Sequence, residues 1–100
     1  MLEKDIEKFL VREVKKLGGL CYKWVSPGNA GVPDRIVLLP NSPALFVELK
    51  ANKGKLSRLQ EVQVKKLRSL NAPVYILYGL EEVKEFIEWN SNRTDTNSTA

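Results

Sequence analysis

Residues 31–50, GVPDRIVLLPNSPALFVELK, decide the fold of this chain. Two apolar runs, residues 34–39 and 44–50, are separated by Pro40-Asn41-Ser42-Pro43. Proline, asparagine and serine between two runs rich in β-branched and aromatic residues are typical of a turn that joins two strands. We therefore expect residues 34–50 to form a β-hairpin.

Charged side chains interrupt these apolar runs. Glu48 and Lys50 are two residues apart, so both point to the same face of their strand. A turn centred on residues 41 and 42 places Asp34 opposite Glu48 or Leu49, and facing Cβ atoms are about 5 Å apart. Charge in a core strand is costly unless it is paired or binds a metal. Asp34, Glu48 and Lys50 therefore predict a divalent-metal phosphodiesterase site.

Mg²⁺ suits such a site because it prefers oxygen ligands and keeps several waters. Asp34 and Glu48 would share the ion, and the backbone carbonyl of Leu49 would be a third protein ligand. Lys50 would position a water molecule or stabilise charge on the phosphate. The same residues also fit a structural arrangement, in which Asp34 ends a strand and Glu48 pairs with Lys50 at a sheet edge.

Three further residues, Gln60, Glu3 and Glu7, have both a catalytic and a structural interpretation. Ser57-x-x-Gln60 is a capping box, yet the helix start that it caps follows the Glu-x-Lys strand closely, so Gln60 would also reach the site. Glu3 and Glu7 are one turn apart on the first helix, and either would supply a third carboxylate. For each of these two glutamates, exposure on a charged helix face is the simpler interpretation.

The remaining sequence surrounds the hairpin with helical and strand-like patterns. Apolar periodicity, Gly18-Gly19 and the clusters of Pro and Gly set the boundaries of these elements. We expect helices at residues 2–17, 57–70 and 80–89, strands at 20–25 and 74–78 in addition to the hairpin, and loops at 26–33 and 51–55. This order predicts an α/β fold with a mixed four-stranded sheet flanked by helices. Residues 1–90 would form one domain, and the polar residues 91–100 a disordered tail.

The charge distribution indicates a polyanionic partner. The net charge is +4, and residues 50–68 hold seven basic residues and one acidic residue. A basic stretch beside a carboxylate site suits nucleic acid, although a solvated helix face has the same composition. The chain has no histidine, which excludes histidine-based nuclease chemistry and zinc sites built on histidine. The single Cys21 and the lack of a long apolar run predict a cytoplasmic protein with no membrane association.

The string SPGNAGVPDRIVLLP…FVELKANKGKLSRLQ resembles the VRR-NUC family of the PD-(D/E)xK nuclease superfamily. The resemblance covers about residues 2–78. It implies the α-β-β-β-α-β core of that superfamily. The family's motif falls on Pro33-Asp34, on Glu48-x-Lys50 and on Gln60, and its first-helix acid falls best on Glu3, with Glu7 as the alternative.

The resemblance implies a Mg²⁺- or Mn²⁺-dependent DNA endonuclease. Small standalone members look like Holliday-junction resolvases and are expected to be homodimers, and such modules occur in phages, plasmids and bacteria. The predicted DNA contacts are Lys23, Arg35, Lys53, Lys55 and Arg58. The leading hypothesis is a homodimer that nicks four-way junctions in a bacterial cell or a phage-infected host. The alternatives are a nuclease of flaps or other branched or single-stranded DNA, a non-catalytic nucleic-acid-binding module, and a protein-interaction subunit.

Overall fold

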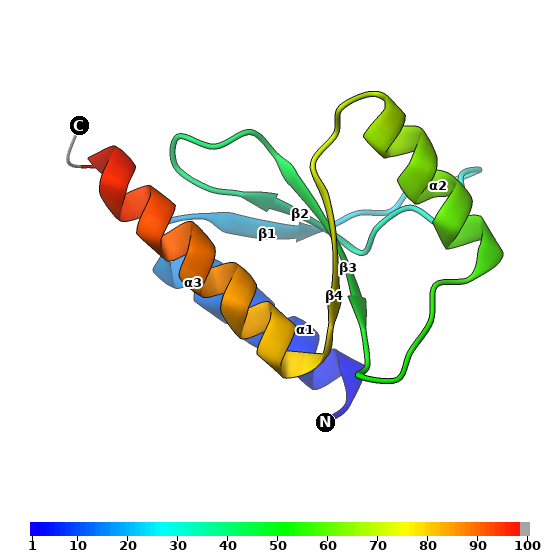
Figure 1. Ribbon diagram of the computed structural model, residues 1–100, viewed down its shortest axis with the longest axis horizontal. Coiled ribbons are helices and arrows are strands. Elements are labelled where there is room, and N and C mark those ends of the chain that lie inside the picture. The colour runs from blue at the N-terminus through cyan, green and yellow to red at the C-terminus, as the bar shows by residue number, and fades with distance from the viewer. Residues whose placement is uncertain (99–100) are drawn as a thin grey trace.

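The hairpin expected from residues 31–50 is the centre of the structure. The computed structural model describes the backbone of residues 1–98 and the side chains of residues 1–93. In chain order the elements are α1 (Glu3–Lys16), β1 (Leu20–Lys23), β2 (Arg35–Leu38), β3 (Leu45–Lys50), α2 (Arg58–Ser69), β4 (Val74–Tyr78) and α3 (Gly79–Ser98). Helices α1 and α3 lie together on one side of the sheet, and α2 lies on the other (Figure 1).

The four strands form one mixed sheet in the order β1-β2-β3-β4. The first three are antiparallel neighbours, whereas β4 pairs parallel to β3. Helix α2 is the crossover that a parallel pair requires. The predicted α/β fold with a mixed four-stranded sheet is therefore confirmed.

Side-chain alternation along β3 separates the core from the polar face. Leu45, Val47 and Leu49 are each at most 2% exposed and pack in one cluster with α1 and α3. The intervening residues, Glu48 among them, point to the face on which α2 lies. At about 25 cal/mol per Å² of apolar area, burying each of these three side chains contributes roughly 1.5–3 kcal/mol. The buried row fixes the register, because a slip of one residue would bring Glu48 into the core.

Two boundaries differ from the expected ones. Strand β1 ends at Lys23 rather than at residue 25, so the loop before β2 is longer. Helix α3 continues to Ser98, through most of the segment expected to be a tail. Residues 90–98 contain neither glycine nor proline, so no residue type there stops a helix. The last two residues, 99 and 100, lie outside the described residues. Within the described part of the chain, no helix is long and apolar enough to cross a membrane.

Candidate active site

The hairpin brings Asp34 and Glu48 together. Arg35 pairs with Val47 in the ladder between β2 and β3, so the same register places Asp34, one residue before β2, opposite Glu48. The Oδ2 atom of Asp34 accepts a hydrogen bond from the backbone N–H of Leu49, with 2.9 Å between the heavy atoms. This bond holds the Asp34 carboxylate over the end of β3, as the spacing predicted.

Glu48 is the most deeply buried charged residue of the site, at 2% exposure. Its Oε2 atom accepts a hydrogen bond of 3.1 Å from Nε2 of Gln60 and lies 3.7 Å from Nζ of Lys50. The pKa of the Glu48 carboxyl is raised from 4.5 to about 7, first by burial and then by the nearby Asp34, while Lys50 opposes the rise. Two facing carboxylates with one lysine leave an excess of negative charge, which a divalent cation would neutralise.

The N-terminus of α2 fixes the position of Gln60. The hydroxyl of Ser57 accepts a bond from the backbone N–H of Gln60, and Oε1 of Gln60 accepts one from the backbone N–H of Ser57. The same side chain therefore closes the capping box with its oxygen and contacts Glu48 with its nitrogen. Both interpretations of Gln60 are compatible, since one amide performs both roles.

Gly31 sets the distance between the loop before Asp34 and the start of α2. Its φ of +91° is strained for any other residue. A Cβ atom at this position would lie 2.6 Å from the backbone carbon and oxygen of Leu59 and 2.9 Å from the backbone nitrogen of Gln60. Glycine at residue 31 therefore lets the loop touch the first turn of α2, beside the carboxylates.

The structure distinguishes between the two acids of α1. Nε of Arg35 donates to Oε2 of Glu7 at 2.7 Å, and both side chains are partly buried. Glu3 is exposed, and its charge contributes to the raised pKa of Glu48. Glu7 is therefore engaged in an ion pair with Arg35, whereas Glu3 has no ion pair among the described residues.

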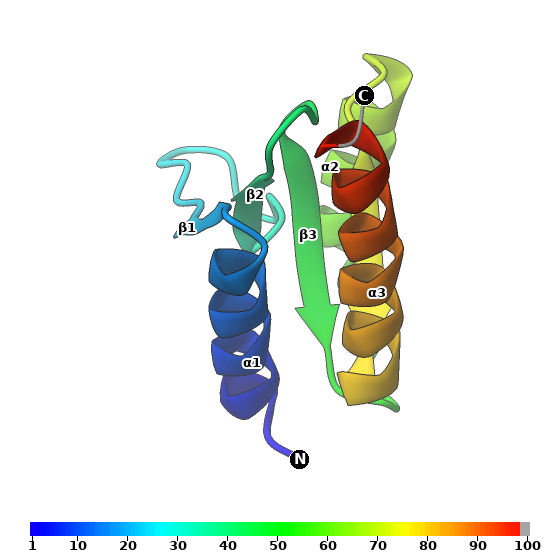
Figure 2. The same ribbon diagram turned by 90° about the vertical axis from the view of Figure 1, so that its left-hand side faces the viewer.

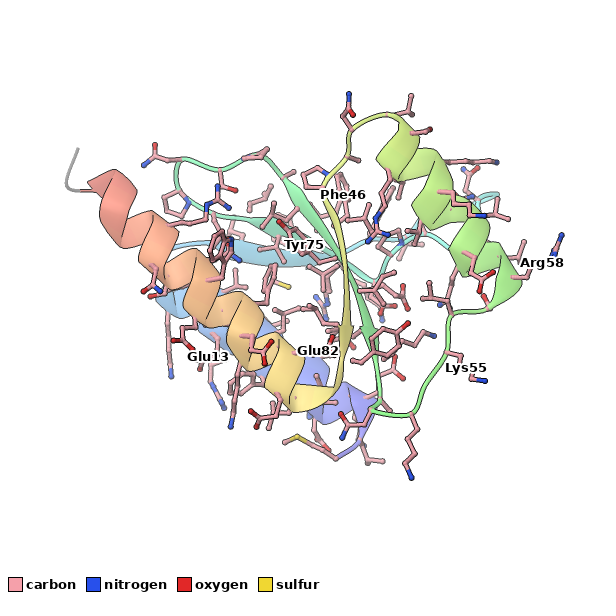
Figure 3. The ribbon with its side chains drawn as sticks, viewed as in Figure 1. Glu13, Phe46, Lys55, Arg58, Tyr75 and Glu82 are labelled. Atoms are coloured by element: carbon pink, nitrogen blue, oxygen red, sulfur yellow. The ribbon has the colours of Figure 1, made fainter. Side chains whose placement is uncertain are left out.

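The predicted DNA contacts fall on two surfaces. Lys53, Lys55 and Arg58 are exposed around the loop before α2, and Figure 3 shows Lys55 and Arg58 pointing away from the domain. Lys23 pairs with Arg35 in the ladder between β1 and β2, so both lie on the α1 face of the sheet, opposite to the carboxylates. The prediction grouped Lys23 and Arg35 with the basic residues beside the carboxylates. The alternation of side chains along a strand could have corrected it, because consecutive residues such as Asp34 and Arg35 point to opposite faces.

An aromatic surface extends the carboxylate face toward β1. Backbone N–H of Trp24 donates to the carbonyl of Asp34, and the Trp24 ring packs against Phe46 with 5.3 Å between centroids. Tyr22, two residues earlier and on the same face, is 56% exposed. The structure therefore places the packed rings of Trp24 and Phe46 on the same face as Tyr22.

The donor set fits a hard divalent cation. Among the described residues, no three His, Cys, Asp or Glu side chains are close enough to hold a metal by themselves. Two carboxylates and the adjacent Leu49 carbonyl are oxygen donors, and Mg²⁺ is commonly held by only one or two carboxylates with several waters. Asp34, Glu48 and the Leu49 carbonyl are therefore the residues that would hold the ion.

Comparisons with known proteins agree with this fold. The VRR-NUC domain family matches residues 3–81. The chain is 49% identical over 75 residues to "Putative nuclease p44" of Acyrthosiphon pisum secondary endosymbiont phage 1, covering 75% of this chain and 81% of the relative. It is similar to a solved VRR-NUC domain with a TM-score of 0.80 and 30% identity, over 86% of this chain and 94% of that one. A second solved VRR-NUC domain protein, 14% identical with a TM-score of 0.69, shares the fold over 88% of this chain and 86% of its own.

Proposed function

The chain belongs to the VRR-NUC domain family, and we propose that it is a Mg²⁺- or Mn²⁺-dependent DNA endonuclease that cuts branched DNA. Family membership and the phage relative support nuclease activity. The observation that carries the proposal is the buried Glu48, held by Gln60 and Lys50 and facing Asp34. A bound divalent ion would acidify a water molecule and neutralise charge on the scissile phosphate.

Each residue of the site has a distinct role in this proposal. Asp34 and Glu48 hold the cation. Lys50, on the same face as Glu48, orients the attacking water and stabilises the negative charge that develops on the phosphate. Gln60 holds the Glu48 carboxylate in place through its hydrogen bond, and Glu3 is the first-helix acid. In-line attack leaves a 5′-phosphate and a 3′-hydroxyl.

The proposed substrate is a four-way junction, cut by a homodimer. In this proposal, the preference for a DNA shape comes from the surface of this domain together with a second copy of the chain. Two sites related by a two-fold axis would suit paired nicks in a symmetric junction. Lys53, Lys55 and Arg58 would contact phosphates beside the site.

The test is cleavage of a labelled four-way junction beside flap, duplex and single-stranded DNA of matched sequence. Each substrate is incubated with Mg²⁺, with Mn²⁺ and with EDTA, and Lys50→Ala is the control variant. We expect metal-dependent, paired nicks in the junction that are lost in the control. Light scattering after gel filtration measures whether the active species is a dimer.

The possible results separate the parts of the proposal. Metal-dependent cutting of flaps or single strands alone would keep the nuclease and reject the junction. Full activity in an Asp34→Ala variant would reject the site. DNA binding without cleavage in any metal would instead favour a non-catalytic binding module.

A further inference from the structure

A basic groove of about 520 Å³ runs along α1. Lys4, Lys8, Arg12 and Lys15, here called the groove cations, line its helical wall, and Arg35 of β2 lies at its sheet side. We infer that this groove binds the phosphate backbone of a DNA arm that leaves the active site. The inference rests on the proposed nuclease function, because it adds a second DNA track to the one beside α2.

The groove cations form one continuous stripe. At 3.6 residues per turn, their spacings of four, four and three residues place them within an arc of about 80° on the helix. Lys4, Lys8 and Lys15 are exposed, and no ion pair involves them within the described residues. Glu7, the acid of the groove, is neutralised by Arg35 at 2.7 Å. Arg12 pairs with Glu13 at 3.3 Å, so the uncompensated positive charge of the stripe lies on Lys4, Lys8 and Lys15.

The groove begins at the edge of the candidate active site. Both views place the N-terminal end of α1 level with the C-terminal end of β3, where Glu48 and Lys50 lie (Figures 1 and 2). Glu3, whose charge acts on Glu48, directly precedes Lys4, the first groove cation. At 1.5 Å per residue the stripe from Lys4 to Lys15 is about 16 Å long. That length matches about five phosphates of one duplex strand at 3.4 Å per nucleotide.

The position of the groove indicates the kind of DNA that fills it. An endonuclease needs DNA on both sides of the bond that it breaks. Lys53, Lys55 and Arg58 lie around the start of α2, whereas the groove lies beside α1 on the other side of the sheet. Two basic tracks that leave one site on opposite sides of a sheet suit two arms that diverge, as they do in branched DNA.

The experiment measures how DNA binding depends on salt. Binding of a fluorescein-labelled four-way junction is titrated in EDTA, so that cleavage does not interfere, at KCl concentrations between about 50 and 200 mM. Three proteins are compared: the unmodified chain, K8Q/K15Q in the groove, and K16Q/K84Q outside it. The two variants lose the same charge, and Lys16 and Lys84 are paired with Glu13 and Glu81 in the structure.

The slope of log K against log[KCl] is negative, and we expect its magnitude to fall by about 1.8 in K8Q/K15Q, since each lost phosphate contact removes about 0.9. The K16Q/K84Q slope should equal that of the unmodified chain. Equal slopes for the groove variant and the unmodified chain, or equal losses in both variants, would overturn the inference. If K8Q/K15Q bound DNA as the unmodified chain does but no longer bound poly-glutamate, the groove would be assigned to an acidic protein. That result would also overturn the inference. The comparison of slopes tests whether the groove binds DNA even if the unmodified chain binds DNA without cutting it. Such a lack of cleavage would count only against the proposed function.

Discussion

Replacing the buried Glu48 by glutamine should make the metal-free protein more stable at pH 8 while abolishing cleavage. The pKa of Glu48 rises from 4.5 to about 7 on folding, first through burial and then through Asp34. Because the folded state holds this proton more tightly, the stabilisation is fully present below pH 4.5 and is lost as the pH rises through 7. Each pKa unit corresponds to about 1.4 kcal/mol, so ionised Glu48 destabilises the fold by up to about 3 kcal/mol at pH 8.

Glutamine keeps the contacts of the protonated acid without its titration. Its oxygen still accepts from Gln60, and its amide nitrogen replaces the acid proton in a hydrogen bond to Asp34. The free energy of unfolding in urea with EDTA, measured between pH 4 and 8, should fall with pH in the unmodified chain. That fall should be smaller by up to about 3 kcal/mol in Glu48→Gln. The exposed Glu88→Gln is the matched control, and its free energy of unfolding should stay within about 0.5 kcal/mol of the unmodified chain.

Adding Mg²⁺ should cancel most of the stability advantage of Glu48→Gln. An ion that binds only the folded chain stabilises it by about 2.7 kcal/mol at a hundred times its dissociation constant, and the glutamine variant should gain much less. The reasoning is refuted if Glu48→Gln is no more stable than the unmodified chain at pH 8 in EDTA. It is equally refuted if the two proteins have the same dependence on pH.

Three other substitutions and one labelling experiment test the surroundings of the site. Gly31→Ala should lower the free energy of unfolding in urea by about 2–4 kcal/mol, because alanine is strained at this left-handed φ and its Cβ clashes with the first turn of α2. The substitution should also lower kcat, because Gln60 shifts. An unchanged kcat would contradict this reasoning. Glu7→Gln should lower the free energy of unfolding by about 1–2 kcal/mol, because it leaves the partly buried Arg35 unpaired, and it should retain metal-dependent cleavage. Glu3→Gln should leave the free energy of unfolding unchanged and weaken cleavage. The opposite pattern would exchange the roles of the two glutamates. Because burial raises the pKa of the Cys21 thiol to about 11, iodoacetamide at pH 8 should label it much more slowly in the native chain than in urea; equal rates would show that the thiol is accessible.

Local patterns in the sequence were sufficient to predict the elements and the pairing that matters most for the site. Proline and asparagine at residues 40–43 predicted the hairpin, and the spacing of two residues placed Glu48 and Lys50 on one face of their strand. The capping box at Ser57 fixed the start of α2 to within a residue. These predictions succeeded because each depends on residues close together in the chain.

The tertiary structure alone decided which distant side chains meet. It pairs Glu7 with Arg35 and leaves Glu3 to act on Glu48, a choice that depends on how α1 packs across the sheet. It also places Arg35 on the α1 face and turns a stripe of lysines on α1 into the wall of a groove. The sequence by itself therefore determined the order of strands and helices and the hairpin that carries the candidate site, because hydrogen bonding and side-chain periodicity are local. The division of its charges between two sides of the sheet arises only when helices dock, since docking geometry is set by packing between residues far apart in the chain.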